Sequence, residues 1–126
     1  MSRMIFERYS EQMIRLLHKR NWDDVLELAT AIHEIWSTGG QLLICGNGGS
    51  AGTPSHSAGD WSKELALPTL CHVDNISGLT AWANDTEYEN VFKGQLETFL
   101  RPGDIVLGYS GSGNSANSVP DYSSIG

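Results

Sequence analysis

A short apolar run that ends directly in a glycine-rich loop is the feature that most restricts how this chain can fold. Residues 41–45 are almost wholly apolar, and Gly46-Asn47-Gly48-Gly49-Ser50, the glycine loop, follows without a spacer. Such a run is typical of a strand buried on both faces of a parallel sheet. The segment from Ser50 to Leu65 has the composition of a helix, and Pro54 is tolerated only because it lies near the helix start. The pattern predicts a strand, a tight turn and a helix, the repeating unit of an α/β sheet.

The same order of strand and loop occurs again toward the C-terminus. Asp104–Tyr109 predicts a strand that enters Ser110-Gly111-Ser112-Gly113-Asn114-Ser115, the serine loop. The elements predicted between the two loops are a strand over 69–73 that ends at Asp74 and two helices over 76–83 and 86–100. Strands that alternate with helices indicate right-handed crossovers and a parallel sheet covered on both faces.

Two amphipathic helices are predicted before the first strand. Residues 4–20 carry apolar side chains at helical spacing, and the second helix begins at Asn21, a favourable N-cap, and ends at Gly39-Gly40. A chain of 126 residues has the length of one domain. We therefore expect a single domain over residues 1–126, with the helical pair at 1–38 and the α/β part at 41–126.

The charge balance and the apolar segments restrict the partners and the compartment. Eight Lys and Arg against 15 Asp and Glu give a net charge of -7, which disfavours nonspecific binding to nucleic acid or to an anionic membrane. No apolar run approaches the roughly 20 residues of a membrane span, and the N-terminus lacks the apolar stretch of a signal peptide. Cys45 and Cys71 lie in predicted strands and are expected to be buried reduced thiols. We expect a cytoplasmic protein without a nucleic-acid or membrane partner.

Both loops have the features of a phosphate site. The glycine loop opens a helix, so its backbone N–H groups and the helix N-terminus can hold an anion, and Ser50 adds a hydroxyl. The serine loop repeats the arrangement with three serines, an asparagine and two glycines. Loops at the carboxyl ends of neighbouring parallel strands line one crevice, where open α/β sheets bind ligands. Glycines that only make tight turns would explain either loop alone, whereas the two together favour a phosphorylated ligand.

A dinucleotide site is the alternative that the same loop leaves open. Gly46-x-Gly48-x-x-Ala51 fits the dinucleotide fingerprint, and Asp74 ends the next predicted strand, where a ribose-binding acid would lie. Two features disfavour a dinucleotide site. The gap in the sequence between the fingerprint and Asp74 is wide, and a dinucleotide site does not require a serine-rich second loop. A nucleoside-triphosphate P-loop is disfavoured because the chain has no Gly-Lys-Ser or Gly-Lys-Thr.

Two pairs of polar residues are candidates for further chemistry. His56 and Asp60 lie four residues apart on the helix that leaves the glycine loop, hence on one face, where they could ligate a divalent metal or move protons. Pairs of this kind are also common on helix surfaces, and a catalytic zinc normally takes three protein ligands, so others would have to come from elsewhere. Asn84-Asp85 is either the stop of the short helix or part of the site.

Several motifs resemble the sugar isomerase (SIS) domain family, in the family's order and over nearly the whole chain. They are Cys45-Gly46-Asn47-Gly48-Gly49-Ser50-Ala51, Leu79-Thr80-Ala81, Asn84-Asp85, Glu89-x-Val91-Phe92, Arg101-Pro102-Gly103-Asp104 and the serine loop. Within the family the chain is most similar to the aldose–ketose isomerases that interconvert sedoheptulose 7-phosphate and a heptose 7-phosphate for bacterial envelope (lipopolysaccharide) sugar synthesis. The resemblance implies a flavodoxin-like three-layer α-β-α fold, of which this chain would hold about three strands.

The resemblance also implies roles for individual residues. Ser110, Ser112 and Ser115, with Gly111 where the family has threonine, would bind the sugar phosphate. The residues expected to contact the sugar are Asn47, Gly48, Ser50, Asn84 and Asp85. His56 would be a zinc ligand. Asp60 stands where the family has a glutamate that serves in proton transfer and metal binding.

The resemblance ends after the serine loop. Family members continue with further strands and a terminal helix that supplies a glutamine and a histidine, whereas Ser118–Gly126 resembles nothing in the family. We therefore expect a truncated or divergent chain, with an open sheet edge that a dimer or tetramer would cover. In the family the N-terminal helices build a tetramer.

Three functions follow as expectations. The first is a phosphosugar-binding protein that resembles the isomerases acting through an enediol, with Asp60 as the base and little activity in this chain alone. The second is a non-catalytic, oligomeric phosphosugar-binding or adaptor protein, as some family members are. The third is a dinucleotide-binding domain.

Overall fold

The computed structural model describes residues 3–118, so all of the expected non-family segment except Ser118 lies outside the described residues. Contacts group the chain into two compact units, Met1–Ala31 and Ile32–Gly126. The first unit is helical, and the second contains the sheet and both loops.

The predicted N-terminal helices are both present. Helix α1 covers Arg3–His18 and helix α2 covers Trp22–Thr38. Asn21 supplies the expected N-cap of α2, because its side-chain oxygen accepts a hydrogen bond from the backbone N–H of Asp23 at 3.1 Å. No residue of α1 is buried, so the apolar stripe of this helix is exposed within the chain.

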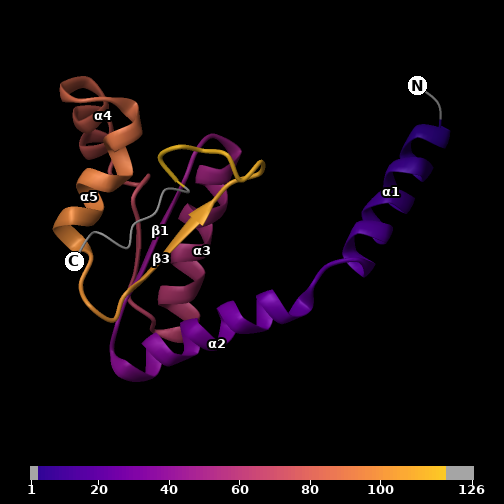
Figure 1. The fold of residues 1–126 in the computed structure, drawn as a ribbon, viewed down its shortest axis with the longest axis horizontal. Coiled ribbons are helices and arrows are strands. Elements are labelled where there is room, and N and C mark those ends of the chain that lie inside the picture. The colour runs from indigo at the N-terminus through magenta and orange to yellow at the C-terminus, as the bar shows by residue number, and fades with distance from the viewer. Residues whose placement is uncertain (1–2, 119–126) are drawn as a thin grey trace. The chain divides into compact units, whose positions relative to one another are not determined.

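Three parallel strands form one sheet in the order β2-β1-β3. Figure 1 labels two of them, β1 and β3. Strand β1 (Leu42–Gly46) lies in the centre, flanked by β2 (Thr69–Cys71) and β3 (Ile105–Tyr109). This arrangement confirms the α/β class and the parallel sheet predicted from the alternation of strands and helices. In the described part of the chain β3 pairs only with β1, so its other side is an edge of this sheet.

Strand β2 is shorter than the predicted segment 69–73. The backbone N–H of His72 still donates to the Ile44 carbonyl of β1, but the N–H of Asp74 turns back to the Cys71 carbonyl at 3.1 Å. This turn ends the strand before Asp74. Asp74 therefore lies after a turn and not at the end of strand β2, where the sequence had placed it.

The core lies on both faces of β1, which is fully buried over Leu42–Cys45. On one face Leu42 and Ile44 pack with residues of α2 and of α3 (Gly49–Leu65). On the other face Cys45 packs with Val91 and Phe92. Alternate residues of a strand face opposite sides, so a strand that is apolar throughout needs helices on both. The result is the predicted three-layer α-β-α arrangement.

The predicted helix over 86–100 is interrupted at its start. Helix α4 covers Ile76–Asp85, a short 3-10 helix η1 covers Tyr88–Asn90, and α5 covers Val91–Phe99. Glu87 is extended, with φ of -135° and ψ of 154°, which separates α4 from η1. Tyr88 is consequently half exposed and does not join the buried stripe of α5.

A glycine lets α4 and α5 approach closely. A Cβ on Gly94 of α5 would lie 2.5 Å from the indole ring of Trp82 of α4. Only a residue without a side chain allows this contact.

None of the helices within residues 3–118 is both long enough and apolar enough to cross a bilayer.

Candidate functional site

The two loops leave adjacent strands at the same level of the sheet. In the parallel register of β1 and β3, Gly46 is paired with Tyr109, so Asn47 and Ser110 are the next residues after these neighbouring strands. The glycine loop and the serine loop therefore both start at the carboxyl edge of the sheet. This is the place where open α/β sheets bind ligands, as the sequence predicted.

The glycine loop is built by close backbone packing. A Cβ on Gly46 would overlap the carbonyl oxygen of Ser50, so the chain can fold back at this point only with glycine. Pro54 has no N–H and cannot donate the helical hydrogen bond to that same carbonyl. Gly48 has φ of 55° and ψ of -122°, a conformation that L side chains rarely adopt. The loop thus has one tightly defined backbone path into α3.

The N-terminus of α3 carries no side-chain cap. Gly48 occupies the N-cap position, and no side-chain hydrogen bond is made there. The first turn of a helix has N–H groups without intrahelical partners and the positive end of the helix dipole. An anion bound at the glycine loop would satisfy these groups, which is the geometry of many phosphate sites.

The serine loop is organised by its own hydroxyl groups. The Ser110 hydroxyl accepts a hydrogen bond from the Gly113 N–H at 2.9 Å, and the Ser112 hydroxyl accepts one from the Asn114 N–H at 3.2 Å. The Ser110 and Ser115 hydroxyl oxygens lie 3.4 Å apart. These are local side-chain turns of the kind that serine favours. The three serines of the prediction therefore lie on one compact loop, where hydroxyl groups can face a common ligand.

Two residues that sequence reasoning did not select join the loops. The Tyr88 hydroxyl donates to Asn47 Oδ1 at 2.8 Å, and Asn47 Nδ2 donates to Asn117 Oδ1 at 2.6 Å. Asn117 is 4% exposed and lies two residues after the serine loop. The sequence pattern placed Tyr88 only within the predicted helix over 86–100, and nothing in the sequence marked Asn117. These contacts join parts of the chain that are distant in the sequence, so no local sequence pattern indicates them.

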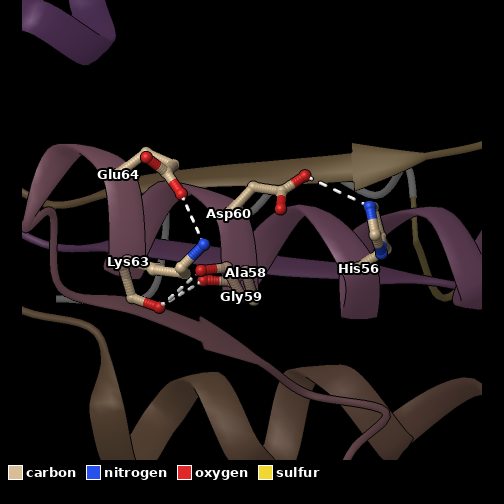
Figure 2. A network of polar contacts seen from close by, with 7 residues as sticks. His56, Ala58, Gly59, Asp60, Lys63 and Glu64 are labelled. Carbon is tan, nitrogen blue, oxygen red and sulfur yellow. Dashed lines mark hydrogen bonds and ion pairs between the residues drawn. The ribbon is translucent and has the colours of Figure 1, made fainter.

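His56 and Asp60 face each other on α3 (Figure 2). His56 Nε2 lies 3.2 Å from Asp60 Oδ2, and both side chains are exposed. With a rise of 1.5 Å per residue, His56 lies about 10 Å and Asp60 about 16 Å along the helix from its first residue. Lys63 and Glu64 form a further exposed ion pair on the same helix at 2.7 Å. The arrangement fits a surface polar pair as well as a pair of functional groups.

The His56–Asp60 pair does not by itself form a zinc site. Imidazole and carboxylate are suitable zinc ligands, but a catalytic zinc normally takes three protein ligands. Among residues 3–118 no group of three or more His, Cys, Asp or Glu side chains is close enough to hold a metal ion. A metal at this pair would need further ligands from elsewhere.

The remaining predicted polar residues have partners of their own. Asn84 Nδ2 donates to Asp85 Oδ1 at 2.8 Å at the exposed end of α4. The Asp74 carboxylate, the ribose ligand of the dinucleotide hypothesis, accepts a hydrogen bond from the Ser55 hydroxyl at 2.6 Å. A nucleotide would have to share this carboxylate with Ser55 of α3.

The two groups with a shifted pKa lie outside the loops. Burial lowers the pKa of His72, although a hydrogen bond between its Nδ1 and Gln95 Oε1 at 3.2 Å partly opposes this. Because Gln95 Oε1 can only accept, Nδ1 carries the proton, and the buried Nε2 has no partner among the described residues. Burial, with the nearby Asp74 charge, raises the pKa of the Cys71 thiol. Both groups are therefore held neutral.

The sequence and the fold are similar to those of known proteins. The SIS domain family matches residues 6–120. The chain is 38% identical over 123 residues to the phosphoheptose isomerase of Chlorobaculum parvum, which covers 90% of this chain and 59% of that protein. It is 47% identical over 93 residues to the probable phosphoheptose isomerase of Thermoplasma volcanium, covering 70% of this chain and 47% of that protein.

Among solved structures, the phosphoheptose isomerase of Neisseria gonorrhoeae matches with a TM-score of 0.79 and 30% identity, over 91% of this chain and 66% of that one. That of Francisella tularensis matches with a TM-score of 0.73 and 25% identity, over 85% and 59%. The chain thus spans little more than half the length of the Chlorobaculum parvum protein. The match over residues 6–120 and the shared fold lead to one conclusion: the chain belongs to the SIS domain family.

Proposed function

We propose that the chain binds a phosphorylated sugar between the glycine loop and the serine loop. The observation that supports this most is the β1–β3 register, which brings a helix N-terminus without a side-chain cap and a hydroxyl-rich loop to one edge of the sheet. Backbone N–H groups and hydroxyls are suitable donors to a phosphate, and the net charge of -7 makes a local site necessary. The relatives are named phosphoheptose isomerases, which supports a heptose phosphate as the ligand, and the family resemblance makes sedoheptulose 7-phosphate the one to test.

We further propose an isomerase site along α3. A sugar whose phosphate is held between the two loops can extend along this helix toward His56 and Asp60. Conversion of a ketose to an aldose through an enediol needs a base near C1 and C2, and Asp60 is the carboxylate proposed for it. A zinc ion held by His56 and further ligands would polarise the sugar oxygen when bound. Aspartate is one methylene shorter than glutamate, and about 1 Å of misplacement can cost on the order of a hundredfold in rate. We expect little turnover from this chain alone.

A non-catalytic phosphosugar-binding or adaptor role is the second candidate. It is favoured by the exposed His56–Asp60 pair, for which residues 3–118 supply no third metal ligand. Metal analysis of the purified protein separates the two candidates. Stoichiometric zinc that is lost in His56→Ala supports the isomerase site, and absence of zinc supports the binding role.

Binding is tested by titration calorimetry with sedoheptulose 7-phosphate. Ser112→Ala and Ser115→Ala each remove a hydroxyl from the serine loop, and we expect each to lower the affinity about tenfold, because hydrogen bonds to a charged group are strong. Ser37→Ala is the matched control, since among the described residues this hydroxyl bonds only to its own helix, at the Glu34 carbonyl. A wild-type chain that binds nothing at millimolar ligand would contradict the proposal.

We also propose that the chain acts as a homo-oligomer, a dimer or tetramer, in the cytoplasm. Apolar side chains on α1 are exposed, among them Ile5 at 55%, Met13 at 42% and Leu17 at 52%. Exposed apolar surface of this kind is typical of an interaction face. Sedimentation velocity tests the assembly, and a monomer at micromolar concentration would refute it.

A further inference from the structure

The Asn47 carboxamide lies in a closed ring of hydrogen bonds. Its Oδ1 accepts from the Tyr88 hydroxyl at 2.8 Å, and its Nδ2 donates to Asn117 Oδ1 at 2.6 Å. Asn117 Nδ2 completes the ring by donating to the backbone carbonyl of Tyr88 at 3.2 Å. These bonds connect the glycine loop, the η1 turn and the segment after the serine loop, which are far apart in the sequence.

The ring leaves little freedom to the asparagine at its centre. The Tyr88 hydroxyl could turn to suit either orientation of the Asn47 amide, but Asn117 could not. A flip would set Asn47 Oδ1 against Asn117 Oδ1 and Asn47 Nδ2 against Asn117 Nδ2, because Asn117 Nδ2 also lies 3.5 Å from Asn47 Oδ1. Asn117 is almost fully buried, and a buried amide that lost its partners would bear the full cost of desolvation. The ring therefore favours one orientation of the Asn47 side chain over the other.

The position of Asn47 gives this orientation a consequence for the loops. Its backbone carbonyl accepts from the Ser50 N–H at 2.9 Å, so the residue is bound to the first turn of α3 as well as to the ring. Asn117 is equally tied to the serine-loop side, because a Cβ on Gly108 of β3 would overlap the Ser118 carbonyl. Movement of one loop relative to the other would break the ring.

We propose that Tyr88 and Asn117 are positioning residues that fix Asn47 and so hold the glycine loop and the serine loop at one spacing. This inference rests on the proposed sugar-phosphate site and deepens it. Within the described residues the ring uses one N–H of the Asn47 carboxamide, so the second N–H is directed by the ring and can meet a sugar hydroxyl. The ring thus acts on the sugar more than on the phosphate, which backbone amides and serine hydroxyls can hold alone.

The first test removes one hydroxyl. Tyr88→Phe keeps the aromatic ring and deletes only the bond to Asn47, and Tyr9→Phe on α1 is the matched control. Titration calorimetry should show that Tyr88→Phe lowers the affinity for sedoheptulose 7-phosphate about fivefold, as expected for one neutral hydrogen bond, with the affinity for inorganic phosphate unchanged within about twofold. Tyr9→Phe should change neither. An equal loss for both ligands, or no loss, would overturn the proposal.

The second test asks whether the two residues act through the same amide. Asn117→Ala releases the other end of the Asn47 carboxamide. If both residues position Asn47, then adding Tyr88→Phe to Asn117→Ala should cost less than twofold in sugar-phosphate affinity, because the orientation is already lost. The full fivefold loss in the double variant would show that the residues act independently and would refute the ring.

A third measurement separates this inference from the proposed function. Amide hydrogen exchange at Gly48, Gly49 and Ser50 reports on the loop without any ligand. Tyr88→Phe should speed this exchange while the melting temperature stays within about 5 °C of wild type, and Tyr9→Phe should not speed it. If the wild type bound no sugar phosphate, faster exchange would still support the positioning role, and unchanged exchange would overturn it.

Discussion

The glycine loop and the serine loop occupy equivalent places in the sheet but are held in different ways. The glycine loop depends on backbone contact, since Gly46 lies against the Ser50 carbonyl and α3 follows at once. The serine loop depends on hydroxyl groups that accept from its own N–H groups. The first presents a helix N-terminus and the second presents side chains. Substitutions that cannot be tolerated in one loop should therefore be mild in the other.

Gly46→Ala should give the largest effect. The added Cβ would overlap the Ser50 carbonyl, and neither β1 nor the first turn of α3 can shift without disturbing the core. We expect a loss of about 3 kcal/mol or more in the free energy of unfolding, measured by urea denaturation. A variant as stable as wild type would show that the glycine loop is not held by this contact.

A pH dependence of stability should come from His72, which lies outside both loops. Burial lowers the pKa of His72 from its usual value of 6.5, so the unfolded state takes up a proton more readily than the folded state. Stability should be constant above pH 6.5 and fall as the pH drops below it, by at most about 1.4 kcal/mol per pH unit for one proton.

His72→Gln should remove this dependence even if it lowers stability at every pH. The measurement is the midpoint of urea unfolding for both proteins between pH 7.5 and 5.5. Parallel slopes for the wild type and the variant would assign the pH effect to another group.

Two alanine substitutions in the serine loop should give the smallest effects. Gly113 has φ of 72° and open space around it, so Gly113→Ala introduces backbone strain of about 1 kcal/mol and no clash. Gly111 has open space and no positive φ, so Gly111→Ala should stay within about 0.5 kcal/mol of wild type. Thermal unfolding of the pair checks the order, and a loss for Gly111→Ala as large as for Gly46→Ala would erase the contrast between the loops.

The sequence predicted those parts of the fold that depend on local pattern. The alternation of apolar runs, loops and helices was sufficient to predict a parallel sheet with both loops at its carboxyl edge, whereas the central position of β1 comes from the structure. Periodicity did not predict the break at Glu87, because an extended residue between two helical segments leaves the apolar spacing unchanged. It also did not predict that β2 ends at Cys71, where a backbone hydrogen bond decides the turn.

The contacts around the site were harder to predict because they join distant positions. His72 had no evident partner in the sequence, yet Gln95 bonds it from α5, 23 residues later. Tyr88 and Asn117 reach Asn47 across 41 and 70 residues. Such pairs depend on how the strands and helices pack, and neither composition nor spacing carries that information. By contrast, the i,i+4 pair of His56 and Asp60 is local, and its distance of 3.2 Å agrees with the prediction from helix geometry.

The exposure of α1 has a spectroscopic consequence. This helix has 16 residues and none of them is buried within the chain. A helix of about this length is only marginally stable in water when nothing packs against it. A partner that binds the helical form of α1 would then raise its helical content by mass action. If that cover is a second copy of the chain, the circular dichroism of a dilution series will decrease together with the assembly, and α1 becomes a built-in reporter of protein concentration.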